Sequence, residues 1–168
     1  MIHKHTSTSK VSILILKGAI VAMAAFVSLF CVFVLPAIHR EWPIELPEYA
    51  MWRYPLITVI FTAALLFFVA ATQIFSLLSL IAHNKAFTKA SVKAMRNIKR
   101  CGYIVALLSA SALPLIFLLA ESDDAPGLIL IYGSIFIGVP MVIGIFSGVA
   151  EALFQNAIDI KSENDLTV

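Results

Sequence analysis

The sequence predicts an all-α protein, a transmembrane bundle of four helices in which two hairpins are joined by a basic amphipathic helix. Of the 168 residues, 61% are hydrophobic and 13% are charged. Soluble domains are usually about 25% charged, and a soluble fold of this size cannot hide so much apolar surface. The apolar residues form four long runs, two on each side of a basic segment at residues 83–100. We therefore expect one integral membrane domain comprising residues 1–168.

Each apolar run is long enough to cross a bilayer as a helix. Backbone groups in lipid must satisfy their own hydrogen bonds, so a helix is the expected form. The first run reaches about 37 Å at 1.5 Å per residue, across a hydrocarbon core of roughly 30 Å. A cleaved signal peptide is the alternative for this run, but Lys17 divides it and its apolar residues continue beyond Ala24. The predicted spans are residues 11–35, 55–82, 101–120 and 128–153.

The distribution of lysine and arginine predicts the orientation. Ten of the twelve lie in the N-terminal head together with Lys17, the basic segment and the C-terminal tail, and two lie in the expected loop at residues 36–54. Cytoplasmic segments carry the excess of Lys and Arg, so both termini and the basic segment are expected in the cytoplasm. The loop at 36–54 and the acidic turn at 121–127 are then outside. Aromatic residues of the first loop favour an interfacial belt over a ligand site.

The basic segment contains six of the twelve Lys and Arg residues and no acidic residue. Five of them recur at spacings that place them along one side of a helix, while Val92, Met95 and Ile98 fall on another face. This pattern predicts an amphipathic helix that lies on the inner membrane surface, with its apolar side toward lipid and its basic side toward anionic headgroups or an acidic partner. Alternatively, the charges serve only as the topology signal. The stripe consists of Lys85, Lys89, Lys93, Arg96 and Arg100.

Three polar residues interrupt the predicted spans: Lys17, Gln73 and Glu151. Lys17 and Glu151 fall at similar depth near the cytoplasmic side, so we expect them to be neighbours. A charge at this depth normally pairs, faces the bundle or reaches the headgroups. A proton or ion relay through the three residues is the functional alternative.

Small residues at i, i+4 spacing predict where helices approach closely. The stripes are Gly102, Ala106 and Ala110 in the third span, Gly144, Gly148 and Ala152 in the fourth, and Gly18 and Ala22 in the first. They favour packing within the chain, although an oligomer interface is an alternative. Pro114 and Pro140 are expected to kink their helices.

Two segments resemble a bacterial family of small four-span membrane proteins that is catalogued as a domain of unknown function. They are NKAFTKASVKAMRNIKRCGY at residues 84–103 and IKSENDLTV at residues 160–168. The resemblance implies a location in the bacterial inner membrane. Members are often encoded beside a small helix-turn-helix regulator, which implies a membrane component of a regulatory pair. The resemblance assigns no active site.

The leading functional hypothesis is a non-enzymatic membrane protein that docks a cytoplasmic regulator or another membrane subunit through the basic segment and the tail. The acidic tail could instead fold back onto the basic stripe. The rival hypothesis is a small transporter or channel subunit that uses Lys17, Gln73 and Glu151. We expect no enzyme, because no nucleophile–base or paired-carboxylate arrangement falls at matching depth. No metal, cofactor or direct nucleic-acid partner is expected, because no ligand spacing or recognition motif occurs.

Overall fold

A computed structural model describes residues 3–45, 47–83, 87–122 and 127–166. Within these residues the regular structure is helical and contains no strand, which confirms the predicted all-α class. The elements in chain order are α1 (His3–Leu29), a π-helix (Phe30–Val34), α2 (Leu35–Glu45), a 3-10 helix (Pro47–Trp52), α3 (Arg53–Ala82), α4 (Lys89–Ser111), α5 (Leu113–Ser122), α6 (Gly127–Tyr132), a second π-helix (Gly133–Gly138) and α7 (Val139–Leu166).

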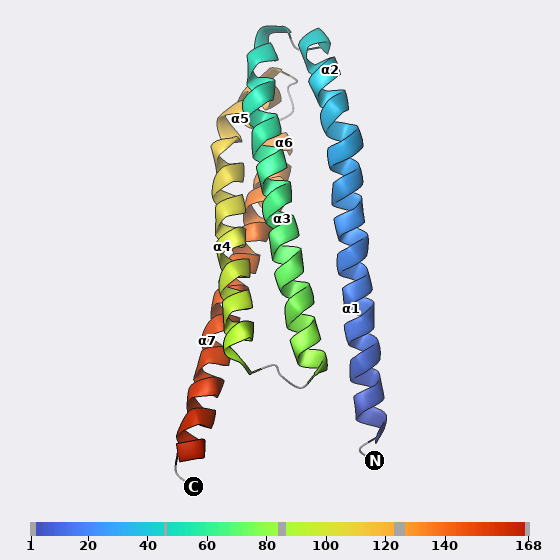
Figure 1. Cartoon of the computed structure of the whole chain (residues 1–168). Coiled ribbons are helices and arrows are strands. Elements are labelled where there is room, and N and C mark those ends of the chain that lie inside the picture. Colours follow the sequence, from blue (N-terminus) through green and yellow to red (C-terminus); the bar gives the residue numbers. More distant parts are fainter. Residues whose placement is uncertain (1–2, 46, 84–86, 123–126, 167–168) are drawn as a thin grey trace.

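These elements form four long rods that run side by side (Figure 1). The rods are α1 with α2, α3 alone, α4 with α5, and α6 with α7. The start of α1, the end of α3, the start of α4 and the end of α7 lie at one end of the molecule (Figure 1). We call this the basic end. The end of α2, the start of α3, the end of α5 and the start of α6 lie at the other end (Figure 1), as expected for two hairpins whose termini share one side.

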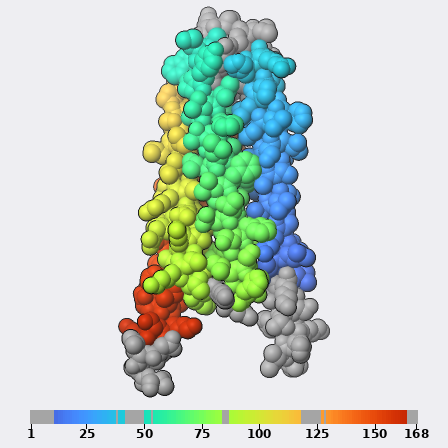
Figure 2. Space-filling view, in the orientation of Figure 1, coloured from blue at the N-terminus to red at the C-terminus, as the bar shows by residue number. Residues whose placement is uncertain are grey.

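The rods pack in the order α1, α3, α4, α7. Helix α4 packs most extensively against α7 and next against α3, whereas α1 packs mainly against α3. Figure 2 shows α1 and α3 side by side along the molecule. Helices α1 and α7 make no comparable contact, so the four rods form an open arrangement rather than a closed ring.

Helices α4 and α7 approach each other closely at Gly102. A Cβ atom at Gly102 would lie 2.7 Å from the carbonyl oxygen of Pro140 and 3.1 Å from the Cα atom of Gly144. Gly144 in turn lies beneath the ring of Tyr103, and Gly148 lies beneath the aliphatic part of Lys99. Small residues therefore bring these helices together, which confirms internal packing for Gly102 in the stripe of the third predicted span and for Gly144 and Gly148 in that of the fourth.

The stripe predicted on the first span does not pack in this way. A Cβ atom at Gly18 would have no neighbour within 4 Å, and Ala22 is exposed. Ala152, at the end of the stripe on α7, is also exposed. Small residues permit close approach, but they require a partner helix to face them.

Proline residues accompany irregular helix geometry rather than complete breaks. The helix continues past Pro36 to Glu45, so the prediction of an irregular loop over residues 36–54 is wrong. Pro36 lies two residues after the end of one π-helix, and Pro140 lies two residues after the end of the other. A π-helical turn alters the hydrogen-bond ladder, and a proline removes one of its donors. Near Pro114 the helix is interrupted at Ala112, between α4 and α5.

Three helical segments of the described chain are long and apolar enough to cross a membrane. Four spans were predicted, and the third of these, residues 101–120, does not form one such helix. Its first part belongs to α4, which begins twelve residues earlier in the basic segment, and the interruption at Ala112 separates it from α5. The three segments are Val11–Glu41, Ala50–Ala82 and Ile129–Glu163.

Candidate binding site

The basic stripe lines an open groove on the outer side of α4 at the basic end. The groove has a volume of about 370 Å³. Four of the five residues predicted from the sequence lie in its wall, and no carboxylate does. The fifth, Lys85, lies outside the described residues. The groove is lined by Lys89, Val92, Lys93, Arg96, Asn97, Arg100 and Gln155.

Helix α4 presents this stripe because the opposite side of the helix is buried. The helix begins after Thr88, whose backbone is extended, and runs without interruption to Ser111. Ala94 and Ile98 are buried where α4 packs against α3 and α7, and Val92 is buried in the groove wall. The basic segment is therefore not a separate helix on the membrane surface, and the prediction that its apolar side faces lipid is wrong. The bundle itself supplies the apolar partner, which leaves the basic side outward.

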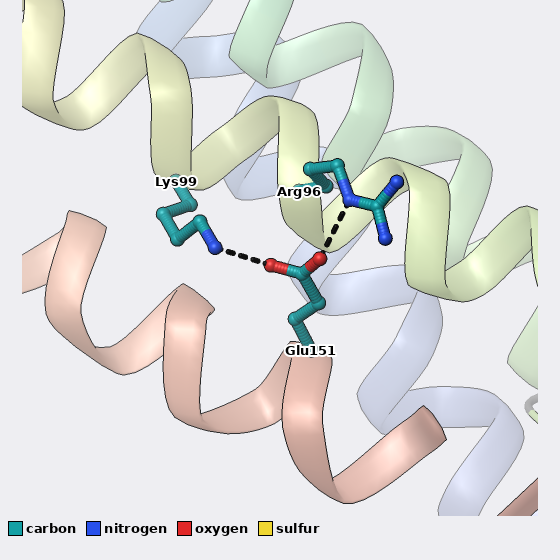
Figure 3. Close-up of polar contacts among 3 residues, drawn as sticks. All are labelled: Arg96, Lys99 and Glu151. Atoms are coloured by element: carbon teal, nitrogen blue, oxygen red, sulfur yellow. Dashed lines mark hydrogen bonds and ion pairs between the residues drawn. The ribbon is translucent and has the colours of Figure 1, made fainter.

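A cluster of three charged side chains joins this part of α4 to α7 (Figure 3). Nε of Arg96 donates to Oε1 of Glu151 over 2.6 Å, and Nζ of Lys99 donates to Oε2 over 2.6 Å. The side chain of Glu151 is 13% exposed, whereas those of Lys99 and Arg96 are 32% and 50% exposed. Charge-assisted hydrogen bonds of this kind are short and comparatively strong. Two cations share one carboxylate, so the cluster keeps a net positive charge.

Lys17 lies elsewhere in the bundle, and its predicted pairing with Glu151 is wrong. Its Nζ donates to Oγ of Ser79 over 2.9 Å and lies 4.8 Å from the centre of the Phe75 ring. Both partners are on α3, because α1 packs against α3 rather than α7. The hydroxyl and the face of the ring both stabilise the ammonium group.

Gln73 is partly buried on α3 and is hydrogen-bonded to neither Lys17 nor Glu151. The structure therefore does not bring the three predicted intramembrane polar residues together. The relay hypothesis required that they converge.

Lys99 completes the cluster, although it lies outside the basic stripe predicted from the sequence. Lys99 and Arg96 are three residues apart, a spacing that places two side chains next to each other on a helix. The third span was expected to begin at Cys101, so Arg96 and Lys99 were placed outside the membrane and not at the same depth as Glu151. Because α4 begins at Lys89, Arg96 and Lys99 belong to the same helix as the third predicted span. Both side chains contact Glu151 near the end of the fourth predicted span.

The tail continues α7 as a helix to Leu166 and does not fold back onto the groove within the described residues. Nε2 of Gln155 donates to Oδ1 of Asp159 over 3.0 Å. Because Gln155 also lines the groove, the first acidic residue of the tail lies one helical turn beyond the groove wall.

The fold and its long apolar helices define an all-helical membrane protein. The family described as DUF2975, protein of unknown function, matches residues 43–168, and the chain belongs to this family. It is also similar to the "Uncharacterized membrane protein YoaS" of Bacillus subtilis (strain 168), with 39% identity over 160 residues that cover 95% of this chain and 99% of the relative. No solved structure matches the chain. The family resemblance seen in the sequence is thereby confirmed.

Proposed function

We propose that this is a non-enzymatic protein of the bacterial inner membrane that docks an acidic segment of a cytoplasmic regulatory partner in the basic groove. The observation that carries the proposal is the groove itself, in which four cationic side chains converge without a carboxylate in the wall. Complementary charge steers association and suppresses wrong partners. Anionic lipid headgroups at the same membrane surface compete for these side chains.

The packing of α4 makes the groove a firm surface. One side of the helix is buried in the bundle, and Lys99 and Arg96 are tied to Glu151 on α7. The contact with Glu151 uses Nε of Arg96, and the guanidinium group has four further N–H donors on its terminal nitrogens. Arginine binds carboxylates in a defined planar geometry. The cluster therefore holds Arg96 in place for a carboxylate-bearing partner.

The proposed orientation puts the basic end in the cytoplasm, because Lys and Arg are concentrated there. The part of the α4–α5 rod that follows Arg100 then crosses the membrane in addition to the three long apolar segments. Leu107 and Phe117 on this rod are exposed, as expected for side chains that face lipid. Transport through Lys17, Gln73 and Glu151 is not proposed, because these residues do not converge.

The orientation predicts which positions react with a membrane-impermeant maleimide. Single cysteines at Ala90, near the groove, and at Gly127, at the opposite end, are suitable reporters because both positions are exposed. In a background without Cys31 and Cys101, position 127 is expected to react in intact cells. Position 90 is expected to react only after permeabilisation. Ser91 is unsuitable because it is fully buried. Labelling of position 90 in intact cells contradicts the orientation.

Neutralising the groove is expected to weaken binding of an acidic peptide. The variant is Lys89→Gln, Lys93→Gln and Arg100→Gln, which leaves the cluster at Glu151 intact. An exposed charge pair contributes about 0.2–1 kcal/mol, so loss of three pairs should weaken binding by about tenfold. The measurement is fluorescence titration of a glutamate-rich peptide against the protein in neutral phosphatidylcholine nanodiscs, at low and at moderate salt. Screening should reduce the difference as salt rises.

A matched control removes three positive charges outside the groove, at Lys4, Lys10 and Lys161. It is expected to retain peptide binding and the partners that co-purify from membranes. Equal weakening in the two triple variants means that net charge alone attracts the peptide, and the groove is then not the docking site. Loss of binding when anionic phospholipid is added to the nanodiscs measures the competition from headgroups.

A further inference from the structure

A second cavity lies inside the bundle and is separate from the basic groove. Its volume is about 340 Å³, and its wall comes from α1, α3, α4 and α7. Small-molecule sites have volumes of about 300–1,000 Å³ and usually contain a few polar groups that orient the ligand. This wall carries apolar side chains and the thiol of Cys101, which itself behaves as a small apolar group. The cavity therefore suits a hydrocarbon chain rather than a polar molecule.

The cavity opens sideways, between α1 and α7. On α4, its wall residues Ile98 and Cys101 are buried. On α1, Leu16 and Met23 are 48% and 56% exposed, and Ile143 on α7 is 47% exposed. Helices α1 and α7 make no substantial contact with each other. The opening lies along candidate membrane-spanning helices, so in a bilayer it meets lipid chains rather than water.

Two lysines, Lys17 and Lys99, directly follow residues of the cavity wall in the sequence. Lys17 directly follows the wall residue Leu16, and among the described residues it has a hydroxyl and a ring as partners but no carboxylate within ion-pair distance. On α4 the wall residue Ile98 is followed by Lys99, which belongs to the cluster with net positive charge. A molecule with an apolar chain in the cavity and an anionic group beside these lysines would match both features.

We propose that the cavity holds one acyl chain of an anionic phospholipid from the leaflet at the basic end, with the lipid phosphate beside Lys17. A void in a packed interior leaves its lining without dispersion partners, and an acyl chain entering from the side supplies them. The ammonium group of Lys17 has three donors, of which one is used by Ser79. This lipid site does not depend on partner docking in the groove, because the two sites have separate walls.

The test uses the full-length protein in phosphatidylcholine vesicles with a trace of phosphatidylglycerol that carries a photoreactive diazirine in its acyl chain. Peptide mass spectrometry locates the adducts. Adducts at Met23 and Cys101 are expected to fall when unlabelled phosphatidylglycerol is added, whereas adducts on the outer lipid-facing surface persist. Filling the cavity by Ala70→Trp is expected to reduce this saturable labelling about tenfold or more. Free inorganic phosphate is expected not to compete, which distinguishes a lipid from a free anion.

The control is Leu65→Trp, which places the same indole side chain at an exposed position of α3 outside the cavity wall and is expected to leave the saturable labelling unchanged. If Ala70→Trp does not fold, Ala19→Leu fills the cavity from the loosely packed α1. Lys17→Met is expected to lower the preference for phosphatidylglycerol over phosphatidylcholine about fivefold, the factor for one basic residue near an anionic surface. Unsaturable labelling at Met23 and Cys101, or labelling unaffected by both filling variants, overturns the proposal. The proposal is also overturned if a filling variant changes only the oligomeric state, from dimer to monomer. A second copy of the chain, rather than a lipid, then occupies the opening.

Discussion

Replacing Gly102 by alanine is expected to destabilise the folded protein by about 1–3 kcal/mol, the range for overpacking a close contact. The added Cβ atom would lie 2.7 Å from the carbonyl oxygen of Pro140, and 3.0 Å and 3.1 Å from the backbone nitrogen and Cα atom of Gly144. These neighbours are backbone atoms, which cannot rotate away as a side chain can. Helices α4 and α7 must therefore separate, and the contacts of Glu151 with α4 should loosen with them. Thermal unfolding in detergent, followed by circular dichroism, measures the loss.

Gly18→Ala is the matched control for this prediction. It is the same substitution in a helix, at a position where a Cβ atom meets nothing within 4 Å. Alanine favours the helix over glycine by about 0.5–1 kcal/mol, so the control is expected to be as stable as the wild type or slightly more so. A Gly102→Ala protein that unfolds at or above the wild-type temperature would show that α4 and α7 do not approach as closely as described here.

Replacing Glu151 by glutamine is expected to destabilise the protein by about 1–3 kcal/mol, the range for hydrogen bonds to charged groups. The change leaves two cations facing each other without their carboxylate. The loss should be smaller than the 3–5 kcal/mol typical of breaking a fully buried pair, because both cations are partly exposed. Lys99→Met should cost less than Glu151→Gln, since Arg96 still pairs with the carboxylate.

Double-mutant cycles distinguish the pairing in the structure from the pairing predicted from the sequence. Glu151→Gln and Lys99→Met share one contact, so their effects on unfolding should be non-additive by about 0.5–3 kcal/mol. Glu151→Gln and Lys17→Met share no partner, so their effects should add to within about 0.5 kcal/mol. Strong coupling in the second cycle, or strict additivity in the first, would contradict the described cluster. Chemical denaturation in mixed micelles provides the four unfolding free energies for each cycle.

Sequence analysis predicted the features that depend on composition and on periodicity along one helix. The helical class follows from the long apolar runs, because in lipid the backbone N–H and C=O groups of such a run must form hydrogen bonds within the run itself. The wall of the basic groove was predicted residue by residue for Lys89, Lys93, Arg96 and Arg100, because helical spacing alone decides which side chains share one face. The small residues at which α4 and α7 approach, Gly102 and Gly144, were identified in the same way, since small residues recur every four positions on both helices.

The sequence did not predict the contacts between helices, because periodicity does not say which face of one helix meets which face of another. Depth along the membrane made Lys17 and Glu151 appear to be neighbours, but α1 packs against α3 and α7 packs against α4. Depth fixes the position of a residue along the membrane normal only. Two charges can pair only if their helices are also neighbours in the plane of the membrane.

The same reason applies to the boundaries of helices and to the faces they bury. The charged start of α4 was separated from its apolar continuation by composition, whereas the backbone forms one helix from Lys89 to Ser111. Val92 and Ile98 were assigned to lipid, yet the neighbouring helices bury them. The sequence by itself determined which residues are apolar and which share a helical face. The tertiary structure decided what covers each face, because that depends on side chains from distant segments, such as Lys17 and Ser79, which are 62 residues apart.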